Sequence, residues 1–383
     1  MLPSLRQILS ITFLCAVVLI TVTAADVRIE PTFGHPHVFA DRIVFASVDG
    51  KRLIGIDKQG HLRWEVAFPA RVFLQRSDDQ LLVQSGAEVY RLNVSNGTKS
   101  QVFRMPKDEI LIAEFGINFL GAADKRFNHN HVRIISPVDR STVWESSSIE
   151  EIVQVTPSTV VAVTADRKYE LNQSYHLENE NLRGFDRKDG QIRWSMPLGA
   201  DLGSVAFAQV GVFLAVVDRL RTYDPTVGDA RLFILNPDTG AVLSKRDGKF
   251  TDLWPGEDSL GVLEVESGGP KTQFYACKLP ECAKENPISL SAKEILRVRL
   301  YGQYIITAGI YDSACFERAT GTRLWEKGQL EWSQPFDDEM VVTDFHPSDQ
   351  TARIVAVELR SGHEQVLFSR KVTRHDQANF RPW

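Results

Sequence analysis

A short phrase that returns along the chain limits the fold more than any other feature of this sequence. Residues 57–64 contain an acidic residue, a turn, a glycine and then a tryptophan, and residues 186–194 and 317–325 repeat this order. A fourth copy, residues 236–244, keeps the turn and its glycine but lacks the tryptophan. A phrase that recurs at intervals of tens of residues is typical of repeat architectures.

The phrase belongs to a larger unit of short β-prone runs. Residues 42–47 and 51–56 are apolar and flank Asp49-Gly50, a sequence that favours a hairpin turn. After the first copy of the phrase, residues 62–68 alternate between polar and apolar, and residues 70–75 start the next unit. The pattern predicts four antiparallel strands in each unit.

The unit can be followed to the end of the chain. With the opening copy it occurs eight times, and about 45 residues per unit is a typical length for a four-stranded propeller blade. The sequence therefore predicts an all-β fold, an eight-bladed β-propeller of four-stranded antiparallel blades. The later copies lie at residues 89–97, 132–144, 182–194, 232–240, 274–282, 314–325 and 354–362.

Two chain ends are candidates for closing the ring of blades. Residues 27–30 and residues 366–370 both have strand-like sequences, and either strand would complete a blade shared by the two ends of the chain. Closure removes the sheet edges that otherwise invite aggregation.

The start of the chain has the pattern of a secretory signal. Arg6 precedes an apolar stretch over residues 8–22, and small residues follow before position 26. We therefore expect a signal peptide over residues 1–25, a propeller domain over residues 26–383, and export to the periplasm or the cell exterior. The alternative is an uncleaved anchor, although the stretch is short for a span of ~20 apolar residues.

Charge and cysteine content narrow the classes of partner and compartment. The formal charge is −5, with acidic and basic residues mixed, and no basic stripe predicts nucleic-acid binding. Cys277 and Cys282 are spaced across a turn and could close a small disulfide in an oxidising compartment, with free thiols as the alternative.

The residue types in the phrase have a structural explanation. An Asp or Asn side chain can accept amide hydrogen bonds inside the turn, and glycine can take the positive φ that the turn requires. A tryptophan on the outer strand offers a large apolar face for packing between blades, and its N–H can reach a carbonyl. We assign blade docking to Asp57, Gly60, Trp64, Trp144, Asp186, Gly190, Trp194, Gly240, Gly321 and Trp325.

This order of acidic residue, turn, glycine and tryptophan resembles the tryptophan-docking motif of the pyrroloquinoline-quinone-like β-propeller family. The resemblance covers essentially the whole chain after the leader. It implies one of two kinds of protein: quinoprotein dehydrogenases, which bind the quinone and Ca²⁺ in a central funnel, or non-enzymatic propellers. The second kind includes the propeller subunit of the outer-membrane β-barrel assembly machinery.

The chain is similar to the non-enzymatic kind in its length and short blades. It has no adjacent Cys-Cys pair of the type that many of the dehydrogenases place against the quinone. We therefore expect a non-catalytic binding or scaffold protein without a cofactor. The alternative is a quinone- or metal-dependent oxidoreductase, with pyrroloquinoline quinone and Ca²⁺ in the central funnel.

Three consecutive units carry long segments between their second and third strands, at residues 122–131, 165–181 and 218–229. Such loops lie on one face and often carry function. Tyr and Arg are frequent interface anchors, which favours a protein or peptide partner; loop growth without a role is the alternative. The predicted partner-binding rim contains Arg126, Phe127, His129, His131, Tyr169, Tyr175, Arg219, Arg221 and Tyr223.

Other chemistry has weaker support. Residues 35–37 and 129–131 each hold a His-x-His pair that could reach one metal ion from a strand, but a third ligand is not evident. The spacing of the nearby carboxylates predicts neither an acid–base pair nor a Ca²⁺ site. We predict no metal site, a monomeric propeller, and membrane contact only through an uncleaved N-terminal segment. The carboxylates considered are Asp166, Glu178, Glu180 and Asp218.

Overall fold

The structure is a computed structural model that places most of the chain after residue 31. Its described residues form an all-β fold with one short helix, α2 (Arg374–Asn379), near the C-terminus. No helix in this part of the chain is long and apolar enough to cross a membrane. The described residues are 32–77, 80–105, 109–114, 120–124, 132–136, 141–169, 175–199, 205–219, 230–256, 259–265, 271–291, 297–308, 312–328, 330 and 335–379.

In these ranges, 32 strands form eight antiparallel sheets, and each sheet uses four consecutive strands in sequence order. We number the sheets 1 to 8 along the chain. Sheets 1 to 4 contain β1 (His37–Val38), β2 (Ile43–Ala46), β3 (Arg52–Ile56), β4 (Leu62–Ala67), β5 (Val72–Ser77), β6 (Gln80–Ser85), β7 (Glu88–Asn93), β8 (Lys99–Arg104), β9 (Glu109–Glu114), β10 (Leu120–Asp124), β11 (Val132–Ile135), β12 (Thr142–Ser146), β13 (Ile149–Val155), β14 (Thr159–Tyr169), β15 (Tyr175–Asp186) and β16 (Ile192–Pro197).

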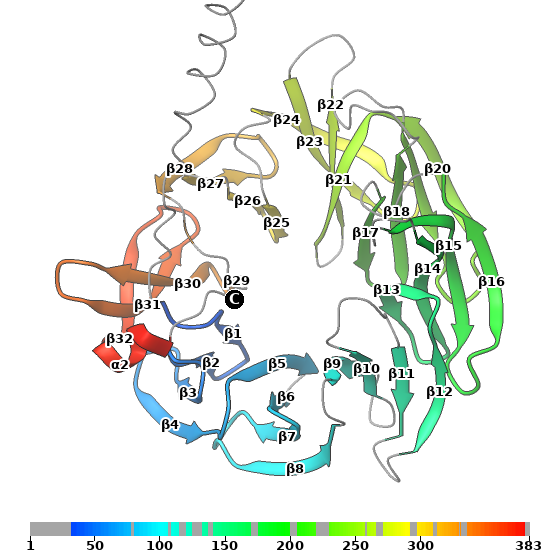
Figure 1. The fold of residues 1–383 in the computed structure, drawn as a ribbon. Coiled ribbons are helices and arrows are strands. Elements are labelled where there is room, and N and C mark those ends of the chain that lie inside the picture. Colours follow the sequence, from blue (N-terminus) through cyan, green and yellow to red (C-terminus); the bar gives the residue numbers. More distant parts are fainter. Residues whose placement is uncertain are drawn as a thin grey trace, which may run out of the picture.

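The second half of the chain repeats this organisation, and the sheets follow one another around a central space with their first strands innermost (Figure 1). Sheets 5 to 8 contain β17 (Val205–Val210), β18 (Phe213–Arg219), β19 (Ala230–Leu235), β20 (Val242–Gly248), β21 (Phe250–Pro255), β22 (Leu260–Val265), β23 (Lys271–Lys278), β24 (Ala283–Ser291), β25 (Arg297–Tyr301), β26 (Tyr304–Ala308), β27 (Asp312–Glu317), β28 (Arg323–Gly328), β29 (Pro335–Phe336), β30 (Glu339–His346), β31 (Thr351–Glu358) and β32 (Glu364–Lys371).

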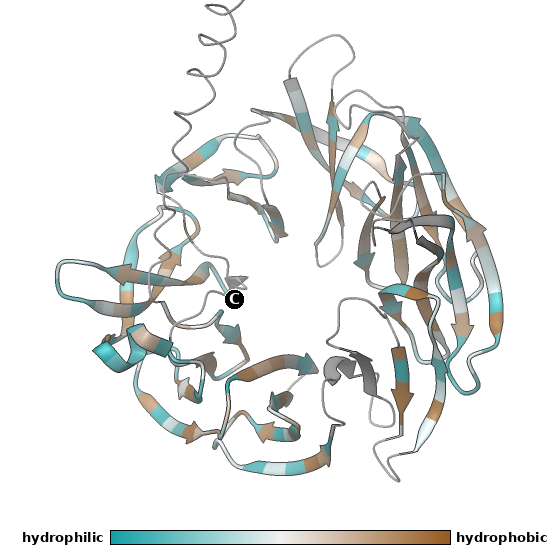
Figure 2. Cartoon of the chain, in the orientation of Figure 1, coloured by the Kyte–Doolittle hydropathy of each residue, from teal (hydrophilic) through white to brown (hydrophobic). Residues whose placement is uncertain are grey.

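Hydrophobic patterning explains this layout. The middle strands are covered on both faces, so β2 and β26 are buried along their whole length. The outer strands alternate between exposed residues and buried or half-buried ones, as in β4 and β16, because only one face packs against protein. Figure 2 shows apolar residues concentrated in the middle strands and polar residues frequent on the outer ones. The arrangement is that of a β-propeller.

The hydrophobic core is divided among the contacts between sheets. The described residues form eight core clusters, and each cluster joins two neighbouring sheets. One cluster joins sheet 8 to sheet 1, where the ring of Phe33 lies 5.0 Å from that of Phe45 and 5.9 Å from that of Phe368. The two ends of the described chain therefore meet through side-chain packing.

The prediction of a shared closing blade is wrong for the C-terminal candidate. Residues 366–370 lie within β32, which pairs with β31 in sheet 8, and sheet 1 is completed by β1 to β4. Residues 27–30 lie outside the described residues. The physical reason is that β1 supplies an innermost strand for sheet 1, so no position in that sheet is left for β32.

The eight sheets share a defect in register between their third and fourth strands. In each sheet the pairing shifts by one or more residues at a β-bulge. The fourth-strand residue just beyond this shift lies toward the next sheet, because a bulge bends the strand and increases its twist. Along the chain, this bulge position is held by Trp64, Phe103, Trp144, Trp194, Ser244, Ile288, Trp325 and Phe368.

Four of these residues are tryptophans, and all four make the same docking contact. Each indole Nε1–H donates to a backbone carbonyl in the turn of the next sheet, over 2.8–3.1 Å. The indole ring also lies against a glycine of that turn, which has a φ of 70–72°. The acceptors and glycines are Val94 and Gly97 for Trp64, Arg187 and Gly190 for Trp144, Pro237 and Gly240 for Trp194, and Leu359 and Gly362 for Trp325.

The remaining joints use smaller or differently placed side chains. Ile288 contacts the turn of sheet 7, where a methyl group on Gly321 would lie 3.1 Å from its Cγ1. Phe368 packs into the core of sheet 1. Gly60 lies so close to the backbone of β32 that a methyl group there would meet the Leu367 carbonyl oxygen at 2.0 Å.

His37 on the innermost strand of sheet 1 is largely enclosed by protein. Burial, with the nearby charges of Arg76 and His35, lowers its pKa from 6.5 to about 4, because the charged imidazolium is poorly solvated there. Arg76 on β5 donates to the Val38 carbonyl over 2.7 Å and lies 4.5 Å from the centre of the Phe39 ring. Arg76 therefore joins the inner strands of sheets 1 and 2 next to His37.

We expect Gly240→Ala to destabilise the protein more than Gly211→Ala. Both glycines have positive φ, 70° and 55°, so an alanine is strained at each by about 1 kcal/mol. At Gly240 the new methyl group would also lie 2.6 Å from Trp194 Cδ2, whereas Gly211 has nothing within 4 Å, and overpacking adds roughly 1–3 kcal/mol. Denaturant unfolding measures the difference; equal losses would contradict the docking contact.

We also expect the free energy of unfolding to fall as the pH drops from 6.5 toward 4. In this window the unfolded chain protonates His37 while the folded chain does not, so protons favour unfolding, by up to about 1.4 kcal/mol per pH unit. His37→Gln should remove this part of the slope in urea titrations at several pH values. Parallel pH curves for the variant and the wild type would refute the assignment.

Candidate partner-binding face

The three long segments predicted from the sequence connect the second and third strands of sheets 3, 4 and 5. They lie between β10 and β11, β14 and β15, and β18 and β19. Because strand direction alternates within each sheet, these hairpins share the face that carries the connections between sheets. Residues 125–131, 170–174 and 220–229 are outside the described residues.

The predicted rim is therefore only partly visible. Tyr169, Tyr175 and Arg219 end strands β14, β15 and β18 on this face, and their backbones are described. Six further predicted residues lie outside the described residues: Arg126, Phe127, His129, His131, Arg221 and Tyr223.

The segment predicted as a loop over residues 165–181 is mostly β-structure, so that prediction is wrong in form. β14 and β15 are 11 and 12 residues long and stay paired from Thr159 to Tyr169. β13 pairs with β14 only up to Thr164, and β16 pairs with β15 only from Asn181. Residues 165–169 and 175–180 thus form a two-stranded ribbon, the β14–β15 ribbon, that extends beyond the sheet.

A bulge marks the base of the ribbon. The pairing shifts between Thr164 and Asp166, and Asn179 opposite has a φ of 55°. Asparagine tolerates this left-handed conformation better than most residues. The Asn179 amide donates to the Asp166 carboxylate over 2.8 Å, and the Asn181 amide donates to the Asn179 carbonyl. Polar side chains that suggested a loop in the sequence therefore stabilise a bulged hairpin.

Two adjacent residues connect the ribbon to sheet 5. The Leu198 amide donates to the Glu180 carbonyl at the base of the ribbon over 3.0 Å. The next amide, on Gly199, donates to the Asp218 carboxylate on β18 over 3.0 Å. The connection between sheets 4 and 5 therefore holds the bases of two of the three hairpins in a fixed relation.

Asp218 is the centre of this connection. Its side chain is 1% exposed and forms an ion pair with Arg231 on β19. A carboxylate is seldom this buried unless it is paired and hydrogen-bonded, and here the guanidinium and the Gly199 amide both bind it. In the sequence, Asp218 stood out only as one of several acidic residues in the long segments. No sequence signal pointed to Gly199, because its role depends on a backbone N–H.

The other sequence candidates do not gather into a chemical site in the described part of the chain. His37 is on β1, far in sequence from Asp166 and Asp218, and its lowered pKa keeps it neutral at pH 7. Among the described residues, no group of three or more His, Cys, Asp or Glu side chains is arranged to hold a metal ion. A cavity of 620 Å³ lies instead at the β7–β8 turn, lined by residues 91–95 and 98–100.

Among the predicted docking residues, the four tryptophans are at the bulges and Gly60, Gly190, Gly240 and Gly321 lie in the turns that face the neighbouring sheet. Asp57 and Asp186 accept amide hydrogen bonds inside their own turns. Cys277 and Cys282 form a disulfide in sheet 6. The sequence did not single out the bulge positions Phe103, Ile288 and Phe368, and it marked Ser244 only as the place where a tryptophan is missing.

Comparison with solved structures identifies the same fold at low sequence identity. AztD from Citrobacter koseri matches with a TM-score of 0.54 and 11% identity, over 88% of this chain and 96% of that one. Hsv2 from Kluyveromyces lactis matches with a TM-score of 0.50 and 10% identity, over 79% and 98%. BamB from Moraxella catarrhalis gives a TM-score of 0.49 and 12% identity, over 89% and 95%.

Sequence comparison gives a closer assignment. No curated protein sequence matches the chain. The model of the family described as outer membrane protein assembly factor BamB matches residues 21–217, just over half of the chain. The repeated docking motif, the four-stranded sheets and this match agree: the chain belongs to the BamB family of pyrroloquinoline-quinone-like β-propellers.

Proposed function

We propose that this protein is an exported, non-catalytic β-propeller that binds a protein or peptide partner through the face formed by the hairpins of sheets 3, 4 and 5. The observation that carries the proposal is the Leu198-Gly199 connection, which fixes the bases of the β14–β15 ribbon and of the sheet 5 hairpin. Binding residues are commonly presented in this way, on hairpins held by a rigid scaffold.

Family membership supports the same type of function, because the matching family is named for a factor in outer membrane protein assembly. A scaffold for assembly acts by holding other proteins. Pre-ordering of the hairpins reduces the conformational entropy that would otherwise be lost on binding. The proposed contact residues are those of the predicted rim, with Tyr169 and Tyr175 at the end of the ribbon.

We also propose a specific architecture and location for the protein. Eight four-stranded sheets and eight clusters that link each sheet to the next support a closed, eight-bladed, monomeric propeller over residues 26–383. The N-terminal signal pattern over residues 1–25 supports export to the periplasm or the cell exterior. The Cys277–Cys282 disulfide fits an oxidising compartment of that kind.

Shortening the ribbon should abolish partner capture. Asp166 and Glu178 face each other across the ribbon, so residues 167–177 can be replaced by Asn-Gly, which forms a two-residue hairpin turn. We expect at least a tenfold loss of the cross-linked partner recovered from the native compartment, about 1.4 kcal/mol of binding free energy or more. The melting temperature should stay close to that of the wild type.

A matched control is available on the same face. His346 and Thr351 face each other in sheet 8, so residues 347–350 can be replaced by the same Asn-Gly turn. This variant should recover the same partners as the wild type. Capture of an identical partner set by both variants would exclude the ribbon as the binding site.

We also propose that the protein works without a cofactor. Addition of pyrroloquinoline quinone and Ca²⁺ to the purified protein should leave the melting temperature unchanged and give no spectrum of bound quinone. A ligand that binds only the folded state stabilises it by about 2.7 kcal/mol at a concentration of 100 Kd. A reproducible rise of several degrees would therefore support the oxidoreductase alternative against this proposal.

A further inference from the structure

The joint between sheets 5 and 6 lacks the side chain that docks elsewhere. Its bulge position is Ser244, the smallest residue among the eight. The other joints without tryptophan have Phe103, Ile288 or Phe368 at this position. The Ser244 hydroxyl reaches the Glu281 carbonyl only at 3.5 Å, the outer limit of a hydrogen bond. The apolar contact made by a large side chain is therefore missing here.

The turn of sheet 6 that faces Ser244 also differs from the turns that the tryptophans contact. In sheet 5, the Gly240 amide donates to the Asn236 carbonyl over 2.8 Å, and Gly240 has a φ of 70°. In sheet 6, the Cys282 amide donates in the same way to the Lys278 carbonyl over 2.8 Å, and Cys282 has a φ of 52°. Cys282 therefore occupies the glycine position of the turn, in a conformation that disfavours a residue with a Cβ.

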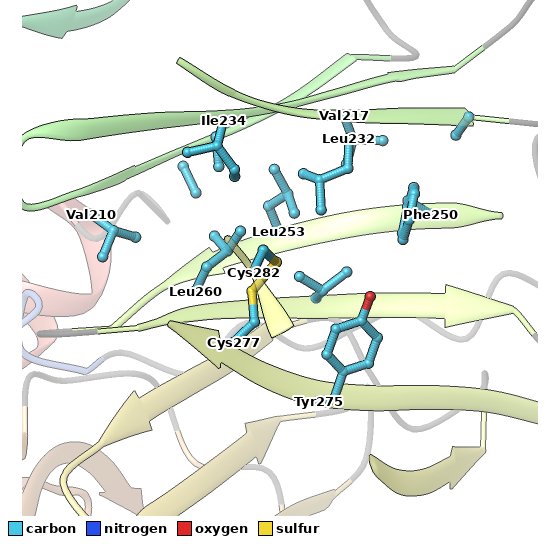
Figure 3. Close-up of a cluster of buried hydrophobic side chains, with 14 residues drawn as sticks. Val210, Val217, Leu232, Ile234, Phe250, Leu253, Leu260, Tyr275, Cys277 and Cys282 are labelled. Carbon is cyan, nitrogen blue, oxygen red and sulfur yellow. A yellow bond between two sulfur atoms is a disulfide. The ribbon is translucent and has the colours of Figure 1, made fainter. Parts of the chain in front are cut away.

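The disulfide to Cys277 places both sulfur atoms where the two sheets meet. Cys277 and Cys282 are 0% and 1% exposed, and they belong to the core cluster that also contains Leu232 and Ile234 of sheet 5. Figure 3 shows the disulfide within this cluster, near Leu253 and Leu260. A hydrogen bond also crosses this joint. Arg246 on β20 donates to the carbonyl of Cys282, the residue at the glycine position, over 3.0 Å, whereas the indoles donate to the carbonyl three residues before the glycine.

We propose that the Cys277–Cys282 disulfide replaces the missing tryptophan at the joint between sheets 5 and 6, so that this joint closes only where thiols are oxidised. The disulfide fills the apolar contact, and Arg246 supplies a hydrogen bond from sheet 5 to the turn of sheet 6, although to a different carbonyl of the turn than the one an indole N–H reaches elsewhere. The covalent bond also holds Cys282 in its left-handed conformation, which an unlinked cysteine would leave readily.

The chemistry is a thiol–disulfide exchange. When the bond forms, the two thiols lose two electrons and two protons, and a disulfide of the exchange partner accepts them and becomes two thiols. Reduction by a dithiol runs the same step in reverse. Because both sulfur atoms are buried in the folded protein, exchange requires the turn to open first.

Hydrogen exchange on the full mature chain tests this proposal. In the wild type, reduction with dithiothreitol should raise exchange of the β20 and β23 amides about tenfold, while the joint formed by Trp194 keeps its protection. The variant Cys277→Ala with Cys282→Gly should show the raised exchange without reductant, because it has no disulfide. Glycine at position 282 accepts the positive φ, so the backbone of the turn is not strained by the substitution. Adding Ser244→Trp to that variant should restore most of the protection. The new tryptophan would pair with Ile234 at the bulge of sheet 5, just as Trp144 pairs with Ile134 at the bulge of sheet 3.

Three results would overturn the proposal. Reduced wild type that exchanges like the oxidised form would show that the disulfide does not hold the joint. Exchange that rises equally at the Trp194 joint would show a general loss of stability. A Ser244→Trp variant that exchanges as fast as its Cys277→Ala/Cys282→Gly parent would show that the disulfide does not replace a docked tryptophan.

Discussion

The structure depends on the packing of each sheet against the next one. A four-stranded sheet has two apolar faces through its middle strands and cannot bury either of them alone. Here every face finds its partner in a neighbouring sheet, and the cluster of Phe33, Phe45 and Phe368 joins the last sheet to the first. Because the burial of apolar area is the main favourable term, the docking contacts serve chiefly to fix the angle and register of the joints.

Half of the joints could be predicted from the sequence, for a physical reason. A tryptophan four residues after a turn glycine is a visible signal, and it identified Trp64, Trp194 and Trp325; Trp144 has no such glycine and was recognised by its place in the repeated unit. The equivalent residues Phe103, Ser244, Ile288 and Phe368 carry no such signal, because their position is defined by a β-bulge. A bulge is a property of strand pairing, which a single strand sequence does not reveal. The prediction of a shared closing blade failed for a related reason. β1, the innermost strand of sheet 1, pairs with β2 through only two residues, and so short a strand is not evident in the sequence.

The candidate face was located by the sequence but not described by it. Long insertions after the second strand of sheets 3, 4 and 5 are evident in the sequence, whereas the polar and charged residues 165–181 predict a loop where the structure has the β14–β15 ribbon. Backbone pairing of β14 with β15 does not require apolar side chains, provided that the hairpin starts from a packed sheet. The Gly199–Asp218 contact was beyond sequence inference, because a backbone amide has no residue-type signature.

Site-specific photo-cross-linking in the native compartment tests the central claim, that this face holds a protein partner. A photoreactive residue at Tyr175, on the ribbon, is compared with one at Thr320, in an exposed turn between the third and fourth strands of sheet 7 and so on the opposite face. We expect a discrete cross-linked protein from position 175 and none from position 320. Cross-links from position 320 alone would contradict it.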